Sequence, residues 1–188
     1  HTYDHTLVSA ITEHDKEFIK FGVEHGVDYF AVSFVGSALD IFECRKVINE
    51  LGGKQKIIAK IERKIALDNL EQIVMAADAV MVARGDLGNE IPLEQIPFVQ
   101  ENIIKIAKKL NKPVIVATQM LFSMIEHDEP TRAEVTDVDT AILQGADAVM
   151  LSDETTIGKY PIQAVGVMDR IITEAKKHMP EDAKLNLL

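Results

Sequence analysis

Short, mostly apolar runs recur along the chain, and each is followed by a segment with a different spacing of apolar residues. The runs occupy residues 29–35, 56–61, 79–83, 114–117 and 148–151. After each run, apolar residues recur every three or four positions, which is the spacing of an amphipathic helix. Continuous apolar runs of this length are typical of parallel strands buried on both faces. The pattern predicts five strand–helix units, preceded by one further helix near the start of the chain.

The helix boundaries follow from capping residues. Thr12, Ser37 and Thr131 stand where helix N-caps are expected, and Glu134 can complete a capping box with Thr131. Together with the apolar spacing, these signals predict helices over residues 13–24, 38–51, 67–77, 98–110, 132–143 and 162–177.

Strands that alternate with helices form a parallel sheet joined by right-handed crossovers. Both a doubly wound open sheet and part of a (β/α)8 barrel fit this alternation. The chain contains neither the dinucleotide fingerprint nor the phosphate-binding loop of doubly wound folds. Polar side chains also follow the apolar runs at their carboxyl ends, which a barrel would gather into one mouth. We therefore predict an α/β fold: a partial (β/α)8 TIM barrel of five parallel strand–helix units, forming a single domain over residues 1–188.

The charge and the single cysteine restrict the partners and the location. The chain has 20 Lys plus Arg against 30 Asp plus Glu, a formal net charge of −10, which argues against a nucleic-acid partner. No apolar run approaches the roughly 20 residues that cross a bilayer. Residues 1–7 lack the apolar region of a signal peptide. Cys44 is the only cysteine, so no intrachain disulfide can form, and we expect a cytoplasmic protein without a membrane partner.

A lysine and two carboxylates follow neighbouring apolar runs. Lys60 and Glu62 share one face of a strand, and the tripeptide alone favours an ion pair that only fixes the strand register. Asp86 lies on an expected glycine-flanked turn after the next strand, where an ordinary solvated turn is the alternative. Two carboxylates on adjacent strands suffice for Mg²⁺, which completes its octahedron with water or substrate oxygens. Lys60 could then neutralise charge that develops on an enolate or a phosphoryl oxygen.

Two hydroxyl groups stand at the ends of the last two predicted strands. Thr118 follows the fourth apolar run, where hydrogen bonding to the local backbone is the common use of a threonine. Ser152 follows the fifth run, and on its own it indicates no more than a turn. The chain shows neither a nucleophile elbow nor the His and Cys spacing of a zinc site.

Five segments taken together resemble one enzyme family. They are K-I-E at 60–62, M-V-A-R-G-D-L-G at 81–88, A-T-Q-M-L at 117–121, P-T-R-A-E-V-T-D-V at 130–138 and D-A-V-M-L-S at 147–152. At these spacings the chain closely resembles the pyruvate kinase family over about residues 12–171. The resemblance implies strands four to eight of that family's catalytic barrel. The family's first three strands, its lid domain and its C-terminal domain are expected to be absent from this chain.

The resemblance also implies a role for each candidate residue. Glu62 and Asp86 are expected to bind the divalent metal, Mg²⁺ or Mn²⁺, and Lys60 to stabilise phosphoryl transfer and the enolate. The backbone at Gly85 and Asp86 and the hydroxyl of Thr118 are expected to hold the phosphoenolpyruvate carboxylate. The hydroxyl groups of Thr118 and Ser152 are expected to lie near the route by which the enolate is protonated.

The implied activity is the glycolytic transfer of a phosphoryl group from phosphoenolpyruvate to ADP, which gives pyruvate and ATP. The family also uses K⁺, but its K⁺ ligands belong to the strands that this chain lacks. The segment is therefore expected to be weakly active or inactive alone. A metal-dependent lyase or aldolase that stabilises an enolate and a non-catalytic barrel remnant are the alternatives. Five units leave two open sheet edges, so we expect a homo-oligomer or association within a longer chain.

Overall fold

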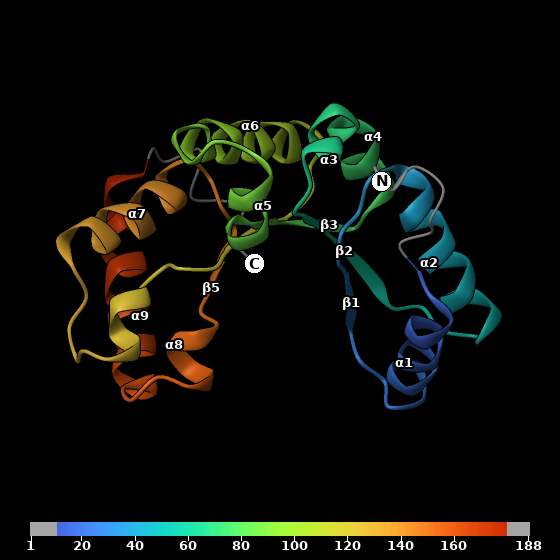
Figure 1. Ribbon diagram of the computed structural model, residues 1–188, viewed down its shortest axis with the longest axis horizontal. Coiled ribbons are helices and arrows are strands. Elements are labelled where there is room, and N and C mark those ends of the chain that lie inside the picture. Colours follow the sequence, from blue (N-terminus) through green and yellow to red (C-terminus); the bar gives the residue numbers. More distant parts are fainter. Residues whose placement is uncertain (1–10, 180–188) are drawn as a thin grey trace, which may run out of the picture.

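The computed structural model describes residues 11–179, and residues 1–7, which bear on the signal-peptide prediction, lie outside this range. Within it, five parallel strands form one sheet in the order β1-β2-β3-β4-β5. A doubly wound sheet reverses its strand order at a switch point, whereas a barrel segment adds each new strand to the same side. The curved sheet of Figure 1 thus confirms the prediction of an α/β partial barrel.

The strands match the apolar runs closely. They are β1 (Tyr29–Val32), β2 (Lys56–Ile61), β3 (Ala79–Ala83), β4 (Val114–Ala117) and β5 (Ala148–Met150). The first strand ends three residues earlier than predicted, because Ser33 and Phe34 form a turn in which Phe34 has a φ of 55°. The last strand ends one residue earlier than predicted.

The predicted helices are present, with one correction. The longer ones are α1 (Glu13–Glu24), α2 (Ala38–Glu50), α4 (Leu70–Ala76), α6 (Ile96–Lys109), α7 (Arg132–Leu143) and α9 (Pro161–His178). Capping boxes form at Thr12, Ser37 and Thr131. The helix predicted over 67–77 is instead two helices, α3 (Lys64–Asp68) and α4. They are separated at Asn69, whose side-chain amide donates to the carbonyl oxygen of Gly36 at 2.9 Å.

Short helices also occupy segments expected to be turns. The glycine-flanked turn expected around Asp86 is instead part of helix α5 (Arg84–Glu90), and α8 (Asp153–Thr156) follows β5. Two 3₁₀ helices, η1 (Leu93–Gln95) and η2 (Phe122–Ile125), complete the described elements. None of the helices within residues 11–179 is long and apolar enough to cross a bilayer.

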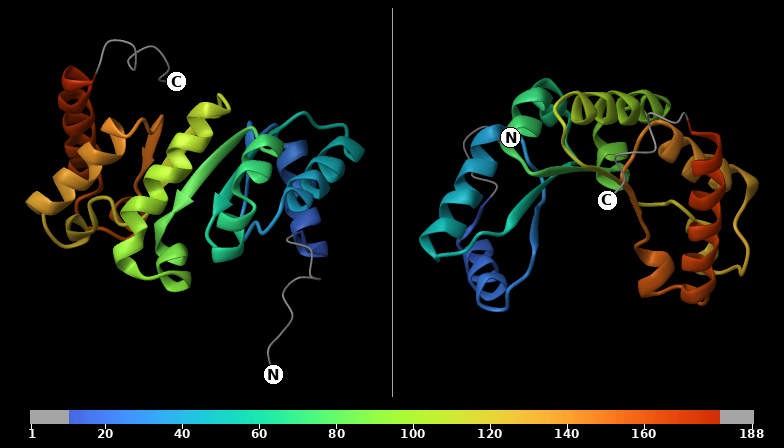
Figure 2. Two further views of the ribbon diagram at one scale, coloured as in Figure 1. Left: turned by 90° about the horizontal axis from the view of Figure 1, so that it is seen from above. Right: turned by 180° about the vertical axis from the view of Figure 1, so that it is seen from behind.

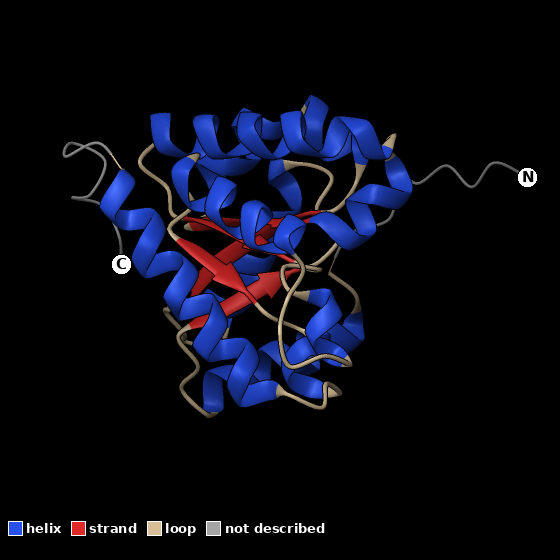
Figure 3. Cartoon of the chain, turned by 90° about the vertical axis from the view of Figure 1, so that its left-hand side faces the viewer, coloured by secondary structure: helices blue, strands red, loops and turns tan. Residues whose placement is uncertain are grey.

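The longer helices cover the convex face of the sheet (Figure 2). In the side view of Figure 3, the strands lie at the centre of the molecule and the helices surround them in projection. Side chains that point from the strands toward these helices form the core and are fully buried, among them Ile57, Ile61, Val80 and Val116. Residues at alternate positions belong to the concave face, which carries Lys60 and Glu62.

Two aspartates brace the amino ends of the strands. The sequence A-D-A-V-M occurs at 77–81 and again at 146–150, each time at the start of a strand. Asp78 accepts a hydrogen bond from the Ile57 N–H at 2.7 Å, and Asp147 accepts one from the Val114 N–H at 2.8 Å. Each aspartate therefore ties its own strand to the preceding one.

A basic side chain from the helix that precedes the neighbouring strand completes each brace. Arg45 pairs with Asp78, and the Lys108 Nζ lies 2.5 Å from Asp147 Oδ1. Asp28 occupies the corresponding place before β1, the edge strand, and is exposed. Within residues 11–179 no strand lies beside β1 on that side, and the Asp28 carboxylate accepts no such hydrogen bond.

Candidate active site

The predicted site residues all follow strands at the same edge of the sheet. Lys60 and Glu62 lie at the end of β2, Asp86 follows β3, Thr118 follows β4, and Ser152 follows β5. Because the strands are parallel and adjacent in chain order, their carboxyl ends meet at one edge, which is where active sites of barrels lie.

Lys60 and Glu62 form an ion pair in which Glu62 is buried and Lys60 is partly exposed. The Lys60 Nζ lies 2.7 Å from Glu62 Oε1 and donates to the Ser33 hydroxyl at 2.9 Å. The other carboxylate oxygen of Glu62 accepts the Phe34 N–H at 2.6 Å, and only 1% of Glu62 is exposed. The pair therefore joins the ends of β1 and β2, as the register-fixing alternative requires, and it also holds a carboxylate in a fixed position.

Glu62 and Asp86 line one pocket of about 360 Å³. The other residues that line it are Phe34, Arg63, Asn89 and Glu90. The structure thus brings the two predicted metal ligands together, while Lys60, Thr118 and Ser152 are not part of this lining. Residues 11–179 contain no group of three or more His, Cys, Asp or Glu that could hold a metal ion. The chemistry of this donor set fits a hard cation such as Mg²⁺ or Mn²⁺, which takes its remaining ligands from water or substrate.

Thr118 is joined to the start of α5. Its hydroxyl oxygen accepts the Gly85 N–H at 2.8 Å and donates to the Ala117 carbonyl oxygen at 2.6 Å. The second contact is the local backbone hydrogen bond that was the alternative interpretation of this threonine. The first contact connects the ends of β3 and β4 and places the predicted carboxylate-binding groups, Gly85 and Thr118, side by side.

The sequence and this geometry agree with one known family. The family model of the pyruvate kinase barrel domain matches residues 4–165. The chain belongs to the pyruvate kinase family. Among curated relatives, it is 51% identical to a pyruvate kinase of Thermotoga maritima over 172 residues, which are 92% of this chain and 37% of that protein. It is 53% identical to a pyruvate kinase of Mycobacterium tuberculosis, over 90% of this chain and 36% of that protein.

A plant relative shows the same relationship. The plastidial pyruvate kinase 2 of Arabidopsis thaliana is 52% identical over 162 residues, which are 86% of this chain and 28% of that protein. The chain therefore spans roughly a third of the length of the pyruvate kinases that it matches, within their barrel domain.

In this pyruvate kinase barrel, Glu154 is a buried carboxylate to which the sequence assigned no role. It is 1% exposed and accepts the Leu121 N–H at 3.0 Å and the Ser152 N–H at 2.9 Å. It thus ties the loop after β4 to the end of β5. Ser152 takes part through its backbone, and within residues 11–179 no hydrogen bond connects its hydroxyl to the other predicted site residues.

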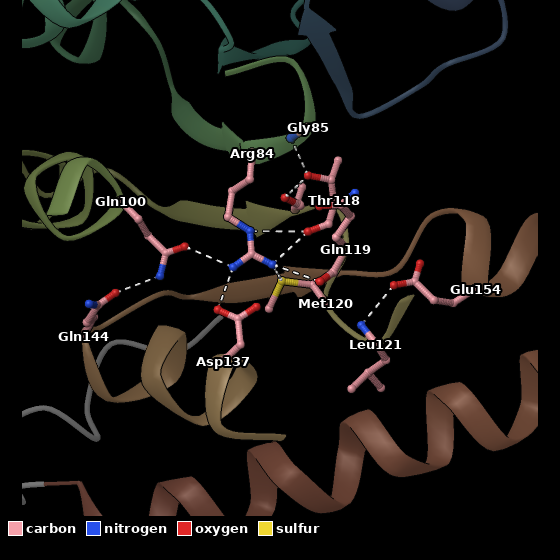
Figure 4. A network of polar contacts seen from close by, with 11 residues as sticks. Arg84, Gly85, Gln100, Thr118, Gln119, Met120, Leu121, Asp137, Gln144 and Glu154 are labelled. Carbon is pink, nitrogen blue, oxygen red and sulfur yellow. Dashed lines mark hydrogen bonds and ion pairs between the residues drawn. The ribbon is translucent and has the colours of Figure 1, made fainter. Parts of the chain in front are cut away.

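Arg84 is the second residue whose role the sequence did not reveal. Its side chain is 10% exposed and pairs with Asp137 of α7, with 2.7 Å between Nη1 and Oδ1. It also donates to the carbonyl oxygens of Thr118 and Gln119 (Figure 4). The R-G-D-L-G motif signals Arg84 itself. Asp137 lies in the P-T-R-A-E-V-T-D-V segment, but no local pattern signals its contact with Arg84, 53 positions earlier in the chain.

Proposed function

We propose that this chain carries the divalent-metal half of a pyruvate kinase active site. The complete site would move a phosphoryl group from phosphoenolpyruvate to ADP, giving pyruvate and ATP in glycolysis. Membership of the family supports this reaction, and the shared pocket of Glu62 and Asp86 is the observation that carries it.

In this proposal Glu62 and Asp86 would hold Mg²⁺ or Mn²⁺. A divalent ion held there supplies a Lewis acid that polarises substrate oxygens. Lys60, whose Nζ is held between Glu62 and Ser33, contributes a fixed positive charge at the carboxyl end of β2. Such a preorganised charge stabilises the negative charge that develops on an enolate or a transferring phosphoryl group.

The substrate carboxylate would bind at the junction of α5 and β4. In this structure the Gly85 N–H donates to Thr118, and both groups would turn toward the carboxylate when it binds. Thr118 and Ser152, at the ends of β4 and β5, are our candidates for the route by which the enolate receives its proton. Because phosphoryl transfer depends on positioning and charge stabilisation, these groups can act only when the substrates are held on their other side.

The rest of such a site would come from protein outside these strands. We propose that the segment is weakly active or inactive alone and works within a longer or assembled cytoplasmic protein. In that protein, the strand that completes the barrel would lie against β1, beside the exposed Asp28. The family's K⁺ ligands would belong to the same missing part.

Titration calorimetry with Mn²⁺, alone and then with oxalate as an enolate mimic, tests the metal site. We expect Mn²⁺ to bind and oxalate to bind only after it. Asp86→Asn should abolish both, and because Asp86 is exposed, the loss would not reflect unfolding. Glu62→Gln should do the same, with circular dichroism to check its fold. Glu94→Gln, which changes an exposed carboxylate outside the pocket, is the matched control.

The outcomes separate the alternatives. An absence of Mn²⁺ binding in the folded wild-type chain would support the non-catalytic remnant and contradict the proposed function. If the metal binds, a lactate-dehydrogenase-coupled assay of the completed barrel with phosphoenolpyruvate distinguishes the two enzymes. Pyruvate release that requires ADP as the phosphoryl acceptor indicates the kinase. A metal-binding barrel that releases no pyruvate from phosphoenolpyruvate and ADP favours the lyase, which would break a carbon–carbon bond of another substrate.

A further inference from the structure

Arg84 makes an unusual number of hydrogen bonds to a single turn. Its Nη2 and Nε donate to the Thr118 carbonyl oxygen at 2.8 and 3.3 Å, and Nη2 also donates to the Gln119 carbonyl oxygen at 3.3 Å. The guanidinium carries five donors in a rigid fork, so it can hold both carbonyl groups at once.

The turn held in this way has a backbone conformation that its residues rarely adopt. Thr118 has a φ of 74° and Gln119 a φ of 51°. Positive φ values are uncommon for residues other than glycine, and for a β-branched residue such as threonine they are true outliers. A conformation of this kind persists only where surrounding contacts hold it, and such residues cluster at functional sites.

Contacts from outside the mouth hold the Arg84 side chain itself. Asp137 on α7 lies 2.7 Å from Nη1, and Gln100 on α6 accepts from the same nitrogen at 3.4 Å. Gln100 in turn donates to Gln144 at 2.8 Å, which links α6 to the end of α7 (Figure 4). The guanidinium is thus fixed by two helices of the convex face and does not line the pocket that contains Glu62 and Asp86.

Both residues of the Arg84-Gly85 dipeptide form hydrogen bonds with Thr118. The Arg84 side chain bonds the Thr118 carbonyl group, while the N–H of the next residue, Gly85, bonds its hydroxyl group at 2.8 Å. Arg84 therefore influences the position of the Thr118 hydroxyl in two ways. It holds the Thr118 backbone at the end of β4, and its own backbone at the end of β3 carries the neighbouring Gly85 N–H.

We infer that Arg84, braced by Asp137, is a positioning residue that holds Thr118 in its left-handed conformation and so sets its hydroxyl for the substrate. The functional half of this inference rests on the proposed function. Lysine at this position would keep the charge but lose the fork, because one ammonium group cannot reach two carbonyl groups and Asp137 in the same geometry.

Two measurements on the full chain test the inference. NMR of Thr118 reports its backbone conformation through the Cα and Cβ chemical shifts and the HN–Hα coupling. Calorimetry reports oxalate affinity for the Mn²⁺-loaded chain. In Arg84→Lys we expect the left-handed signature to disappear and oxalate to bind about tenfold more weakly, as when a supporting group behind a ligand is lost. Mn²⁺ affinity should remain that of the wild type, which a general loss of structure would not allow.

Arg45→Lys is the matched control, because Arg45 is also a partly buried arginine that pairs with an aspartate and bonds a carbonyl group, at the opposite end of the sheet. It should change neither Thr118 nor oxalate binding. If Arg84→Lys fails to fold, Asp137→Asn keeps the guanidinium but removes its charged brace, and a smaller shift in the same direction is expected.

Each result has a distinct meaning. A Thr118 signature that stays left-handed in a folded Arg84 variant overturns the positioning role. Loss of the signature with unchanged oxalate affinity overturns the functional half of the inference. If the wild-type chain binds neither Mn²⁺ nor oxalate, the proposed function fails together with that functional half, and the NMR comparison still decides whether Arg84 holds the turn.

Discussion

The two ends of the strands use left-handed backbone conformations in opposite ways. Among the described residues, those with positive φ at the amino ends are Gly26, Gly52, Asn111 and Gly145. Those at the carboxyl ends are Phe34, Thr118 and Gln119. Glycine and asparagine adopt this conformation readily, whereas the other three types do so at a cost in free energy. Strain is therefore confined to the end of the sheet that holds the candidate site, as expected when stability and function occupy opposite ends of a barrel.

The carboxylates at the two ends differ as well. At the amino ends, Asp78 and Asp147 each join a strand N–H to a basic side chain, so their contacts serve the fold alone. At the carboxyl ends, Glu62 and Glu154 are buried against backbone N–H groups, while Asp86 is exposed in a pocket with Glu62. The mouth therefore combines one carboxylate outside the pocket, Glu154, whose hydrogen bonds support the structure, with the two pocket carboxylates, Glu62 and Asp86, that we propose as metal ligands.

The largest effect on stability is expected at Glu154, which tests whether a carboxylate at the mouth can be purely structural. Glu154→Ala leaves the buried N–H group of Leu121 and the partly buried N–H group of Ser152 without an acceptor. Two such losses cost about 3 kcal/mol of the free energy of unfolding, which urea denaturation can measure. Glu154→Gln should recover part of this, because its one remaining oxygen can accept one of the two hydrogen bonds.

The matched control for Glu154 is a nearby exposed glutamate. Glu126 pairs with Lys159, and both side chains are more than half exposed. Exposed pairs contribute little to stability, so Glu126→Ala should leave the urea midpoint almost unchanged. Equal effects of the two alanine variants would contradict the role assigned to Glu154.

A smaller loss of stability is expected at the amino ends, without any effect on metal binding. Asp147→Ala removes the acceptor of the Val114 N–H and the partner of Lys108, which should cost about 2 kcal/mol of unfolding free energy. The folded variant should bind Mn²⁺ as the wild type does. A lower Mn²⁺ affinity in this variant would show that the two ends are not independent.

Acid should weaken the brace at Asp78. Burial raises the pKa of Asp78, but hydrogen bonds from Arg45 and from the Ile57 N–H together bring it below its ordinary value of 3.8. A carboxylate with a lowered pKa in the folded state stabilises the protein above its unfolded pKa, and this contribution disappears as the pH falls through the folded value. Stability should therefore fall below about pH 4, and less steeply in Asp78→Asn.

Urea unfolding between pH 6 and pH 3 measures this dependence. Glu94→Gln, which changes an exposed carboxylate, is the control and should follow the wild-type curve. If Asp78→Asn retained the full acid sensitivity of the wild type, other carboxylates would have to account for it. Glu134 is the foremost of these. Burial raises its pKa as well, but hydrogen bonds from Ser123 and Thr131 lower it overall.

Most of the fold could be predicted because its signals are local. Apolar runs and capping residues lie within a few positions of the elements that they define, and so the strands and the caps at Thr12, Ser37 and Thr131 were predicted correctly. Helix α5 was missed because its sequence R-G-D-L-G-N-E contains two glycines, which disfavour a helix. The break at Asn69 depends on a bond to Gly36, 33 positions away, which no local pattern reveals.

The candidate site divides in the same way. Lys60, Glu62, Asp86, Thr118 and Ser152 could be selected because each follows an apolar run, and parallel strands bring such positions to one edge. The contacts that support them were not predictable. Glu154 reaches Leu121 across 33 positions, and Arg84 reaches Asp137 across 53, so only the packing of the whole sheet and its helices reveals these contacts.

The smallest expected effect compares the left-handed residues at the two ends directly. Gln119 and Asn111 are both exposed and have φ values of 51° and 54°. Glycine removes the conformational strain at either position, and it increases the conformational entropy of the unfolded chain by the same amount at both. The difference in unfolding free energy between the two variants therefore reports only the difference in strain. Asparagine tolerates this conformation better than glutamine, so glycine relieves more strain at position 119 than at position 111. The free energy of unfolding of Gln119→Gly should therefore exceed that of Asn111→Gly by about 0.5 kcal/mol. Urea midpoints of the two variants measure this difference, and equal midpoints would mean that the contacts from Arg84 already offset the strain at the mouth.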